Sequence, residues 1–187
     1  MTAAVVLAAG ASVRLGEPKQ LVQLAGEKLL ERAVRTAREA GCSPVVVVLG
    51  ADAELIAAQC DLSDAVVAIN DVWSEGMASS IRLGLRTLGA AAKDADGVVL
   101  MTCDQPAVTA EHLRTLMKAG ETTASAYAGR RGVPAYLPST AFAQLMELRG
   151  DAGARSLLAQ ARCVELADGE LDIDTVEDLA EAERRFR

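Results

Sequence analysis

The sequence lacks a hydrophobic segment long enough to cross a membrane. Its longest apolar runs, around residues 45–49 and 98–101, are much shorter than the stretch that a bilayer requires. No charged region precedes the apolar run at the N-terminus, so a secretory signal is not indicated either. We therefore expect a cytoplasmic protein.

Cysteine is also sparse and widely spaced. The four cysteines, at positions 42, 60, 103 and 163, form no CxxC pair, so neither a zinc site nor a disulfide framework is indicated. The only histidine, His112, lies on a predicted helix with no partner in view, and we expect a solvent-facing side chain and not a catalytic base. Cys103 is expected to be a small buried strand residue and not a reactive thiolate.

The sequence has fewer basic than acidic residues. Nineteen basic residues against twenty-six acidic ones give a net charge of −7 and an isoelectric point near 4.8. An extended nucleic acid or an anionic membrane would be repelled, so we expect neither as a partner. A small anion can still be bound by a few local cations and backbone amides, because short-range contacts outweigh a distant net charge that salt screens.

Short β-branched runs alternate with helical patterns over most of the chain, which has 187 residues and is 51% hydrophobic. This alternation predicts a single-domain, Rossmann-like, three-layer α/β/α fold with a mostly parallel sheet. The expected strands are 3–9, 44–49, 65–69 and 97–102, separated by helices at 28–40, 53–60 and 77–88.

The last third of the chain changes character. We expect a helix at 111–118 with Thr109 as its N-cap, and then strands with a loop over the sheet's edge in "TTASAYAGRRGVPAYLP". The expected elements that follow are helices at 141–148 and 152–161, a strand at 162–166 and a closing helix at 176–185.

The segment "LAAGASVRLGEPKQL", Leu7 to Leu21, follows the first strand and opens at the carboxyl edge of the sheet, where ligands of such folds bind. Small residues at 10–12 let backbone N–H groups approach phosphate oxygens, and Arg14 and Lys19 can neutralise the remaining charge. The spacing matches neither GxxxxGK[ST] nor GxGxxG. Taken alone, the loop is as well explained as a connector with two solvated cations.

A buried strand, "VVLMTCDQP", ends in Asp104 at the same edge. Because Thr109 can cap the next helix, Asp104 has no evident structural task, and its carboxylate is placed to hold Mg²⁺. Far along the chain, "LDIDTVEDL" carries Asp172 and Asp174 on one face of an extended segment, with Ile173 pointing to the core. By themselves these acids fit a solvated turn equally well, but together with Asp104 they predict a shared metal site.

In the same segment, Thr175 and Asp178 form a T-x-x-D capping box that begins the last helix. A second helix start, "GMASSI" at 76–81, combines small residues with free amides. It fits a ligand site and a helix N-terminus capped by its own serines about equally well.

Six segments occur in a familiar order: "LAAGASVRLGEPKQL", "NDVWSEGMASSIRLGL", "CDQP", "GVPAYLP", "LRGDAGARSLL" and "DIDTVEDL". Together they resemble the MobA-like nucleotidyltransferases, and within them the molybdenum cofactor cytidylyltransferase branch. The resemblance runs from about Leu7 to Leu179 and implies one MobA-like NTP transferase domain over 1–187, with a nucleotidyltransferase fold of the glycosyltransferase-A-like type.

The resemblance implies a transferase that moves CMP from CTP to the terminal phosphate of a phosphorylated pterin, molybdopterin, and releases pyrophosphate. A molybdoenzyme is then the candidate recipient of the product, and Mg²⁺ is the implied cofactor. The implied catalytic residues are Arg14, Lys19 and Asp104, and the implied metal ligands are Asp104 and Asp174, with Asp172 as the substitute. The implied nucleotide-binding residues are Leu7, Ala8, Ala9, Gly10, Ala11, Ser12, Arg14, Lys19, Gly76, Met77, Ser79 and Ser80.

By the same resemblance, Ala9 stands where the guanylyl branch has "LAGG", so its methyl group favours cytosine over the larger guanine. Arg130 and Arg131 are a solvated pair by default and an acceptor-anion clamp by analogy. Arg155 has the same two interpretations. Asp151 fits a helix N-cap as well as a substrate contact, and Trp73 fits a lid anchor as well as a packing residue.

The chain departs from the family pattern at two positions. Val176 replaces a proline often found after "DIDT", and Ser139 stands where relatives usually carry a basic residue, which puts the pterin acceptor in doubt more than the nucleotidyl chemistry. The alternatives are a sugar phosphate or other small phosphorylated acceptor, and a non-catalytic carrier of the dinucleotide cofactor. A Rossmann-type oxidoreductase would require NAD(P) binding, which the missing GxGxxG disfavours.

Overall fold

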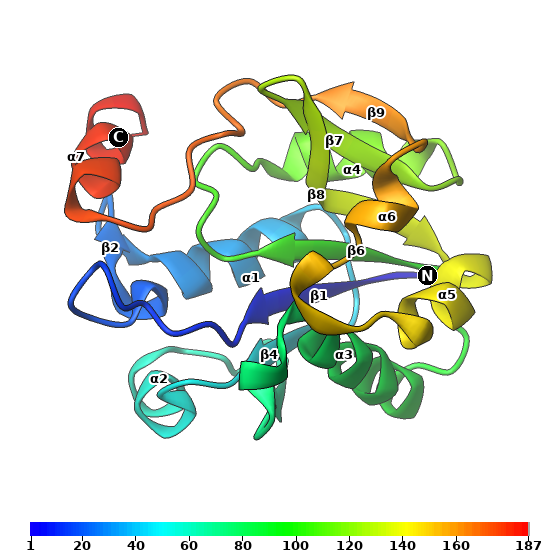
Figure 1. Cartoon of the computed structure of the whole chain (residues 1–187), viewed down its shortest axis with the longest axis horizontal. Coiled ribbons are helices and arrows are strands. Elements are labelled where there is room, and N and C mark those ends of the chain that lie inside the picture. The colour runs from blue at the N-terminus through cyan, green and yellow to red at the C-terminus, as the bar shows by residue number, and fades with distance from the viewer. Residues whose placement is uncertain (187) are drawn as a thin grey trace.

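The structure is a computed structural model that describes residues 1–186, without the side chain of Ala152. A seven-stranded sheet runs through the molecule in the order β5-β4-β1-β6-β8-β7-β9 (Figure 1). Its strands are β1 (Thr2–Ala8), β4 (Val45–Leu49), β5 (Val66–Ile69), β6 (Gly97–Thr102), β7 (Thr123–Tyr127), β8 (Arg130–Pro138) and β9 (Arg162–Glu165). Strands β5, β4, β1 and β6 are parallel neighbours, as the sequence predicted, whereas β8 runs antiparallel to both β6 and β7.

The central strands are apolar except at Thr2 and Thr102, which fits a sheet with both faces covered by helices. Strand β1 pairs with β4 on one side and β6 on the other, so that Val5 lies between Val46 and Leu100, and all three side chains are buried. This arrangement confirms the predicted three-layer α/β/α class. It also brings the C-terminal ends of β1, β4 and β6 to one edge of the sheet.

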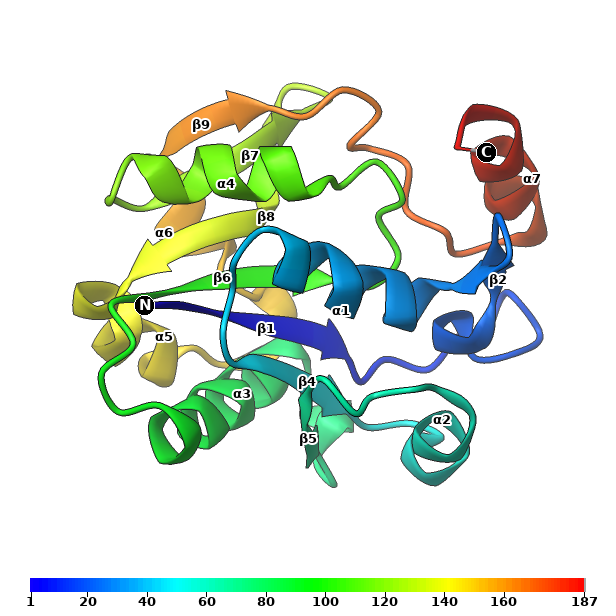
Figure 2. The ribbon, with the colours of Figure 1, turned by 180° about the vertical axis from the view of Figure 1, so that it is seen from behind.

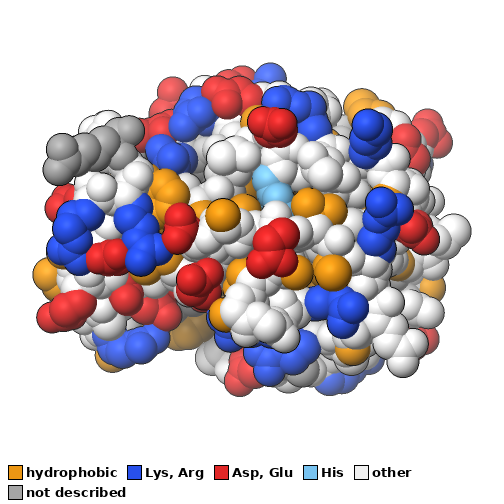
Figure 3. All heavy atoms as spheres, turned by 90° about the horizontal axis from the view of Figure 1, so that it is seen from above, with side chains coloured by type: hydrophobic (Ala, Val, Ile, Leu, Met, Phe, Trp, Pro, Cys, Tyr) orange, Lys and Arg blue, Asp and Glu red, His pale blue; other side chains and the backbone are white. Residues whose placement is uncertain are grey.

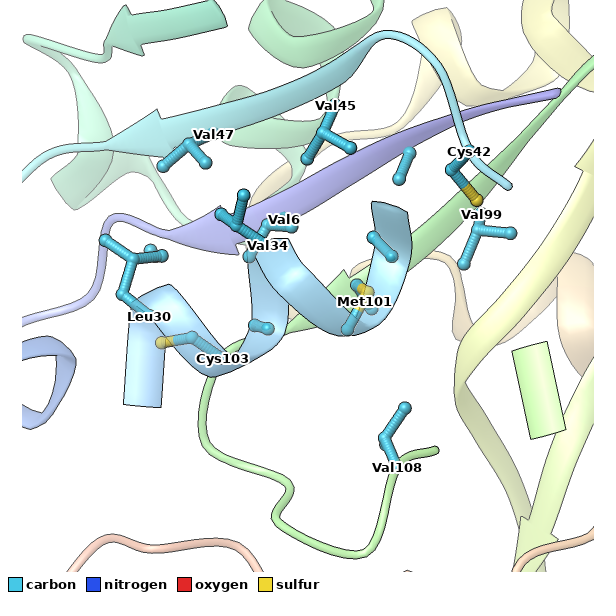
Figure 4. Close-up of a cluster of buried hydrophobic side chains, with 14 of the residues drawn as sticks. Val6, Leu30, Val34, Cys42, Val45, Val47, Val99, Met101, Cys103 and Val108 are labelled. Atoms are coloured by element: carbon cyan, nitrogen blue, oxygen red, sulfur yellow. The ribbon is translucent and has the colours of Figure 1, made fainter. Parts of the chain in front are cut away.

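Helices α1 (Leu29–Glu39), α2 (Ala53–Gln59) and α4 (Ala110–Lys118) contribute to the core on one face of the sheet. Helices α3 (Met77–Ala91), α5 (Phe142–Glu147) and α6 (Arg155–Leu158) contribute to the core on the other. The first set faces the viewer in Figure 2 and the second in Figure 1. Figure 4 shows the first core, where Leu30 and Val34 of α1 pack over Val6, Val47 and the neighbouring strands.

Three buried thiols, those of Cys42, Cys60 and Cys103, belong to that same core. Cys42 and Cys103 are both buried among its apolar side chains (Figure 4). Burial raises the pKa of Cys42 to about 12 and moves the pKa of Cys103 upward as well, so neither is a thiolate at neutral pH. The expectation that Cys103 is a small buried residue is confirmed, although it lies one residue beyond the end of β6 and not within the strand.

A third, smaller core joins the segment 15–29 to the C-terminal segment 173–182. Helix α7 (Val176–Arg185) packs beside a hairpin formed by β2 (Gln23–Leu24) and β3 (Glu27–Lys28), as Figure 1 shows. Their contact buries Leu24, Leu29 and Ile173. The predicted capping box is present, with Thr175 Oγ1 accepting from the N–H of Asp178 and the Asp178 carboxylate accepting from the N–H of Thr175.

Short 3-10 turns connect several elements: η1 (Lys19–Leu21), η2 (Trp73–Glu75), η3 (Ser139–Ala141) and η4 (Gly150–Ala152). The predicted helix at 152–161 is reduced to α6, because Gly153 has a positive φ of 55° that interrupts it. The strands predicted in 122–138 are present as β7 and β8, and both are internal to the sheet, because β8 lies between β6 and β7 and β7 lies between β8 and β9. No helix within residues 1–186 is long and apolar enough to span a bilayer.

Candidate active site

The predicted site residues converge where β1 and β6 end. Asp104 follows β6 and is only two residues beyond its last residue, Thr102. The backbone N–H of Ile173 donates to the carbonyl oxygen of Asp104 at 2.9 Å, and the buried Ile173 side chain anchors the C-terminal segment there. This contact brings Asp172 and Asp174 to the end of β6.

Lys19 lies between the two predicted metal ligands. Its ammonium Nζ donates to Asp104 Oδ2 and to Asp174 Oδ1, each at 2.6 Å. The side chains of Lys19 and Asp104 are only 17% and 14% exposed. Burial by itself lowers the pKa of Lys19, but the charges and hydrogen bonds of Asp104 and Asp174 outweigh it and hold that pKa above its ordinary value. The ammonium is therefore charged at neutral pH.

Arg14 approaches the same group from the solvent side. Its Nη2 donates to Asp174 Oδ2 at 2.8 Å, while its own side chain remains 69% exposed. The two cations of the opening loop thus share Asp174, although they are five residues apart and lie on a loop and a 3-10 turn. The sequence predicted both as phosphate-binding cations and did not predict that they contact the aspartates.

Two side-chain contacts brace the opening loop. Ser12 Oγ accepts from the N–H of Lys19 at 2.8 Å, so its hydroxyl oxygen serves the loop itself. Gln20 is buried, and its Nε2 donates to the carbonyl of Ala8 at 2.7 Å and more weakly to that of Gly10 at 3.4 Å. The role of Gln20 was not predicted. Its sequence context shows only a polar residue followed by the apolar pair Leu21 and Val22.

Asp172 lies beside the ion-paired group and lines the larger of two cavities described below. Burial is the main cause that raises its pKa to about 6, and the charges of Asp104 and Asp174 add to it. Its carboxylate is thus held near two others of the same sign, which favours its protonated form more than usual.

The carboxylates suit a hard divalent cation in charge and ligand type. Mg²⁺ and Mn²⁺ prefer carboxylate oxygens, and Mg²⁺ commonly uses one or two of them together with substrate phosphates. Within residues 1–186 no three or more His, Cys, Asp and Glu side chains gather closely enough to form a complete metal cage. Asp104 and Asp174 nevertheless converge on one cation, the ammonium of Lys19, so the position already attracts positive charge.

A cavity of about 330 Å³ opens beside the loop after β1. It is bounded by the loop backbone, by Lys19, by the start of α3 and by Asp104. The predicted nucleotide-binding residues that line it are Leu7, Ala8, Ala9, Gly10, Lys19, Gly76, Met77 and Ser80. Ala11, Ser12, Arg14 and Ser79 are outside its lining.

A second cavity of about 580 Å³ adjoins the first, and Met77, Thr102, Asp104 and Asp151 line both. Three arginines bound the second cavity, namely Arg130, Arg131 and Arg155. The two cavities therefore form one cleft with a shared wall at Asp104. One side is lined by the loop backbone and many small residues, and the other by three arginines together with Asp104, Asp151 and Asp172.

Several side chains in this region are already engaged. Arg130 lies over the ring of Tyr127 at 5.3 Å from its centroid, and Arg131 Nη1 donates to the carbonyl of Ala159 at 3.0 Å. Arg155 is exposed at the cavity rim. Asp151 lines both cavities and is not the N-cap of α6, which is Ala154, so the N-cap interpretation was wrong.

The serines of "GMASSI" contact Asn70. Its Nδ2 donates to Ser79 Oγ at 2.8 Å and to Ser80 Oγ at 2.9 Å, and all three residues are buried. Ser79 Oγ in turn donates to the carbonyl of Gly76 at 2.8 Å. Ser79 is therefore engaged with its own segment, whereas Ser80 also reaches the cavity wall. Trp73 lies at the mouth of that cavity and packs close to Gly50.

The expectation of a solvent-facing His112 was wrong. The residue is only 9% exposed, and in Figure 3 it appears as a small pale-blue patch bordered by white and hydrophobic atoms. Its Nε2 is 2.8 Å from Ser125 Oγ, which donates to the carbonyl of Pro134. Helix α4 turns His112 toward β7, and burial lowers its pKa. The predicted N-cap, Thr109, is confirmed by its bond from the N–H of His112.

Comparison with known proteins extends this description. The family model of the MobA-like NTP transferase domain matches residues 4–166. Nicotine blue oxidoreductase of Paenarthrobacter nicotinovorans is 34% identical over 194 residues, which cover 94% of this chain and 93% of that protein. The purine catabolism protein PucB of Bacillus subtilis is 34% identical over 194 residues, covering 93% and 92% of the two proteins.

A probable molybdenum cofactor guanylyltransferase of Opitutus terrae is 34% identical over 119 residues, covering 63% of this chain and 54% of that protein. Among solved structures, Rv0371c of Mycobacterium tuberculosis superposes with a TM-score of 0.85 at 32% identity, covering 98% of this chain and 97% of that one. A complex of Rv0371c with manganese superposes with a TM-score of 0.79 at 30% identity, covering 98% of each.

Proposed function

Because the chain belongs to the MobA-like NTP transferase family, we propose that it is a divalent-metal-dependent cytidylyltransferase, with residues 1–187 forming one catalytic domain. In this proposal it transfers CMP from CTP to the terminal phosphate of molybdopterin and releases pyrophosphate. The observation that carries the proposal is the convergence of Lys19 and Asp174 on Asp104, the carboxylate that lines both adjoining cavities.

The two cavities suit two substrates. The smaller cavity, bounded by the loop after β1 and the start of α3, has the backbone amides and small residues that a nucleotide needs. The larger cavity has three arginines for a phosphorylated acceptor. Since Asp104 lines both, the reacting phosphates of the two substrates would meet beside it.

The reaction needs no nucleophile from the protein. An oxygen of the acceptor phosphate attacks the α-phosphorus of CTP, and the bond from that phosphorus to the oxygen bridging to the β-phosphorus breaks, so that pyrophosphate leaves. Lys19 stabilises the charge on the α-phosphate and Arg14 the charge on the leaving group. Asp104 and Asp174 would hold Mg²⁺, with Asp172 as the substitute ligand. The ion supplies further neutralisation of phosphate charge.

Nucleotide choice is assigned to the backbone region that lines the smaller cavity. Ala9 is buried and contributes to that wall, so its methyl group takes space that a purine would need. The relative from Opitutus terrae is named a guanylyltransferase, which makes GTP the competing substrate to test. CTP is our proposal because this chain carries "LAAG" at that position.

Acceptor choice is assigned to the larger cavity. Arg130, Arg131 and Arg155 line its wall, and Arg130 and Arg131 would turn from their present contacts to an acceptor anion, whereas the uncharged Ser139 lies beyond β8 and outside the cavity lining. A pterin phosphate would use the arginines for its anion. A cytoplasmic location and a molybdoenzyme recipient are parts of the same proposal.

The test is an incubation of the protein with molybdopterin and either CTP or GTP, in the presence of Mg²⁺ and then of Mn²⁺. The expected result is a cytidine dinucleotide of the pterin, identified by mass, with pyrophosphate formed in equal amount. Omission of metal should abolish product. Consumption of GTP in preference to CTP would overturn the nucleotide assignment.

The same assay separates the alternatives. Pyrophosphate release with a sugar phosphate, and none with molybdopterin, would assign a different acceptor. Binding of the finished dinucleotide without use of CTP would indicate a carrier. Because one relative is named an oxidoreductase, a parallel incubation with NADH and NADPH is needed, and nicotinamide oxidation without pyrophosphate release would refute the transferase proposal.

A further inference from the structure

The ammonium of Lys19 occupies the gap between the two carboxylates assigned to the metal. Its Nζ is 2.6 Å from an oxygen of Asp104 and 2.6 Å from an oxygen of Asp174. An ion such as Mg²⁺ binds carboxylate oxygens at about 2.0–2.1 Å, so an ion bonded to the same two oxygens would lie in the same gap. An ammonium and a metal ion that use these same two oxygens would therefore exclude each other.

Neither carboxylate is free in this arrangement. Asp104 is largely buried, and Asp174 also accepts from Arg14. The backbone holds both carboxylates in place, through the bond between Ile173 and Asp104 and through the capping box at Thr175. The flexible member of the group is Lys19, whose long side chain can leave the gap without moving the backbone.

We propose that Lys19 is the resident cation of the Asp104–Asp174 pair in the free protein, and that a divalent metal binds there only by displacing it. The proposal rests on the proposed function for the assignment of the two aspartates to the metal. It adds that metal binding is weak in the absence of nucleotide, because displacement leaves the Lys19 ammonium without its partners.

A nucleotide completes the exchange. Lys19 lines the smaller cavity, so its displaced ammonium is within the space that the triphosphate would occupy. The phosphates replace the carboxylates as partners of Lys19, and they also supply the remaining ligands that the metal requires. Metal and nucleotide therefore bind with positive coupling. The phosphates give the displaced ammonium new partners, and the displacement of Lys19 by the metal frees that ammonium for the phosphates.

The first test measures Mn²⁺ binding without nucleotide. Free Mn²⁺ is followed by its electron paramagnetic resonance signal, which falls as the ion binds to protein. Lys19→Gln removes the resident ammonium and keeps a polar side chain, so its Kd for Mn²⁺ should be lower than that of the wild type by about tenfold or more. Lys19→Arg keeps a cation and should remain close to the wild type.

The matched control is Arg14→Gln. It removes the same charge from the same carboxylate, Asp174, but Arg14 is exposed and does not bridge to Asp104. Displacement predicts a change in Kd of no more than about threefold for this variant, because an exposed ion pair is screened by solvent. An equal increase in Mn²⁺ affinity for Arg14→Gln and Lys19→Gln would mean a general charge effect and would overturn the proposal.

The location of the bound Mn²⁺ is checked by adding Asp104→Asn to Lys19→Gln. This double variant should lose the Mn²⁺ affinity that Lys19→Gln gained. Persistence of tight Mn²⁺ binding in that double variant would place the ion elsewhere and would also overturn the proposal.

A second measurement uses only the wild-type protein and does not depend on how a variant folds. Lysine side chains are acetylated briefly with acetic anhydride, and the extent at Lys19 is compared by mass spectrometry with that at the exposed Lys93. Mn²⁺ should increase acetylation of Lys19 severalfold relative to Lys93, because the displaced amine leaves its largely buried place between the two carboxylates and becomes accessible to the reagent. Unchanged acetylation at Mn²⁺ concentrations that saturate the protein would refute displacement.

These readouts are independent of turnover. If Mn²⁺ displaces Lys19 from the two aspartates but the protein forms no nucleotide product, the transferase proposal is refuted and the displacement is still supported. An active cytidylyltransferase in which Lys19→Gln binds Mn²⁺ no better than the wild type would refute the exchange alone.

Discussion

The backbone N–H of Ile173 donates a hydrogen bond to the carbonyl oxygen of Asp104 at 2.9 Å. This single contact joins the end of β6 to a segment near the C-terminus. The Ile173 side chain is fully buried in the small core below α7, so the contact is held from both the backbone and the side chain. The carboxylates of Asp104 and Asp174 meet at Lys19 as a consequence.

Replacement of Ile173 by alanine should therefore affect both stability and the site. Removal of a fully buried isoleucine side chain costs about 2–5 kcal/mol of unfolding free energy, whereas Ile173→Val should cost about 0.5–1.5 kcal/mol. Urea denaturation measures both. In the folded part of the Ile173→Ala population, Mn²⁺ affinity should also fall, and unchanged affinity would show that the segment keeps its place without this side chain.

Asp104→Asn should abolish metal-dependent turnover while the fold survives. The amide keeps the shape of the side chain but loses the charge that attracts Lys19 and the metal, so kcat should fall by at least about 100-fold. Steady-state pyrophosphate release measures the effect, and circular dichroism checks the fold. Asp94→Asn, a change at an exposed position, is the control. Near-normal product formation by folded Asp104→Asn would refute the catalytic assignment.

Ala9→Gly should relax the choice of nucleotide. Loss of one methyl from the cavity wall opens space for a purine, and a methyl-sized change discriminates by about tenfold, so kcat/KM for GTP relative to CTP should rise by about that factor. Competition between the two nucleotides in one reaction measures the ratio directly. Ala11→Gly is the matched control, because Ala11 is exposed and lies outside the cavity lining. An equal rise in both variants would indicate loop flexibility instead.

Arg155→Gln should weaken binding of the acceptor without affecting binding of the nucleotide. Arg155 lines the larger cavity and not the smaller one. Loss of its charge should therefore raise the KM for the phosphorylated acceptor by about tenfold and change the KM for CTP by less than about twofold. Initial rates at varied concentrations of each substrate separate the two constants. Arg162→Gln on β9 removes an exposed arginine as the control. A selective rise in the KM for CTP would contradict the division of the cleft.

His112 predicts a pH dependence of stability. Burial lowers its pKa in the folded state below the ordinary 6.5, so below about pH 6.5 the unfolded chain binds the proton more readily. The contribution to stability is therefore complete above that pH and is lost as the pH falls through the folded-state pKa. Between about pH 7.5 and pH 5, the wild type should lose more unfolding free energy than His112→Gln, which has no titrating ring.

Urea titrations at several pH values, with both proteins side by side, measure that difference. Glutamine can keep a hydrogen bond toward Ser125, which makes it a suitable reference. Parallel loss of stability in the two proteins would mean that carboxylates alone cause the acid sensitivity.

Local sequence patterns were sufficient for the layers of the fold. Continuous apolar runs such as Val45–Leu49 have both faces to bury, and only a sheet covered by helices on both sides can bury them. The capping box at Thr175 and the cap at Thr109 depend on residues three positions apart, so the sequence displays them directly. The antiparallel place of β8 inside the sheet was not predicted, because strand order depends on contacts between distant segments.

The motif order of the sequence determined the family, and the alternation of its strands and helices determined the parallel sheet at whose carboxyl edge a small-anion site beside carboxylates was predicted. Only the tertiary structure decided which charged groups pair with each other. Lys19, Asp104 and Asp174 come from three distant segments, and their hydrogen bonds exist only once β1, β6 and the C-terminal segment are packed together. The same packing turned His112 inward and made Gln20 a brace, since burial and partners are properties of the folded chain and not of local spacing.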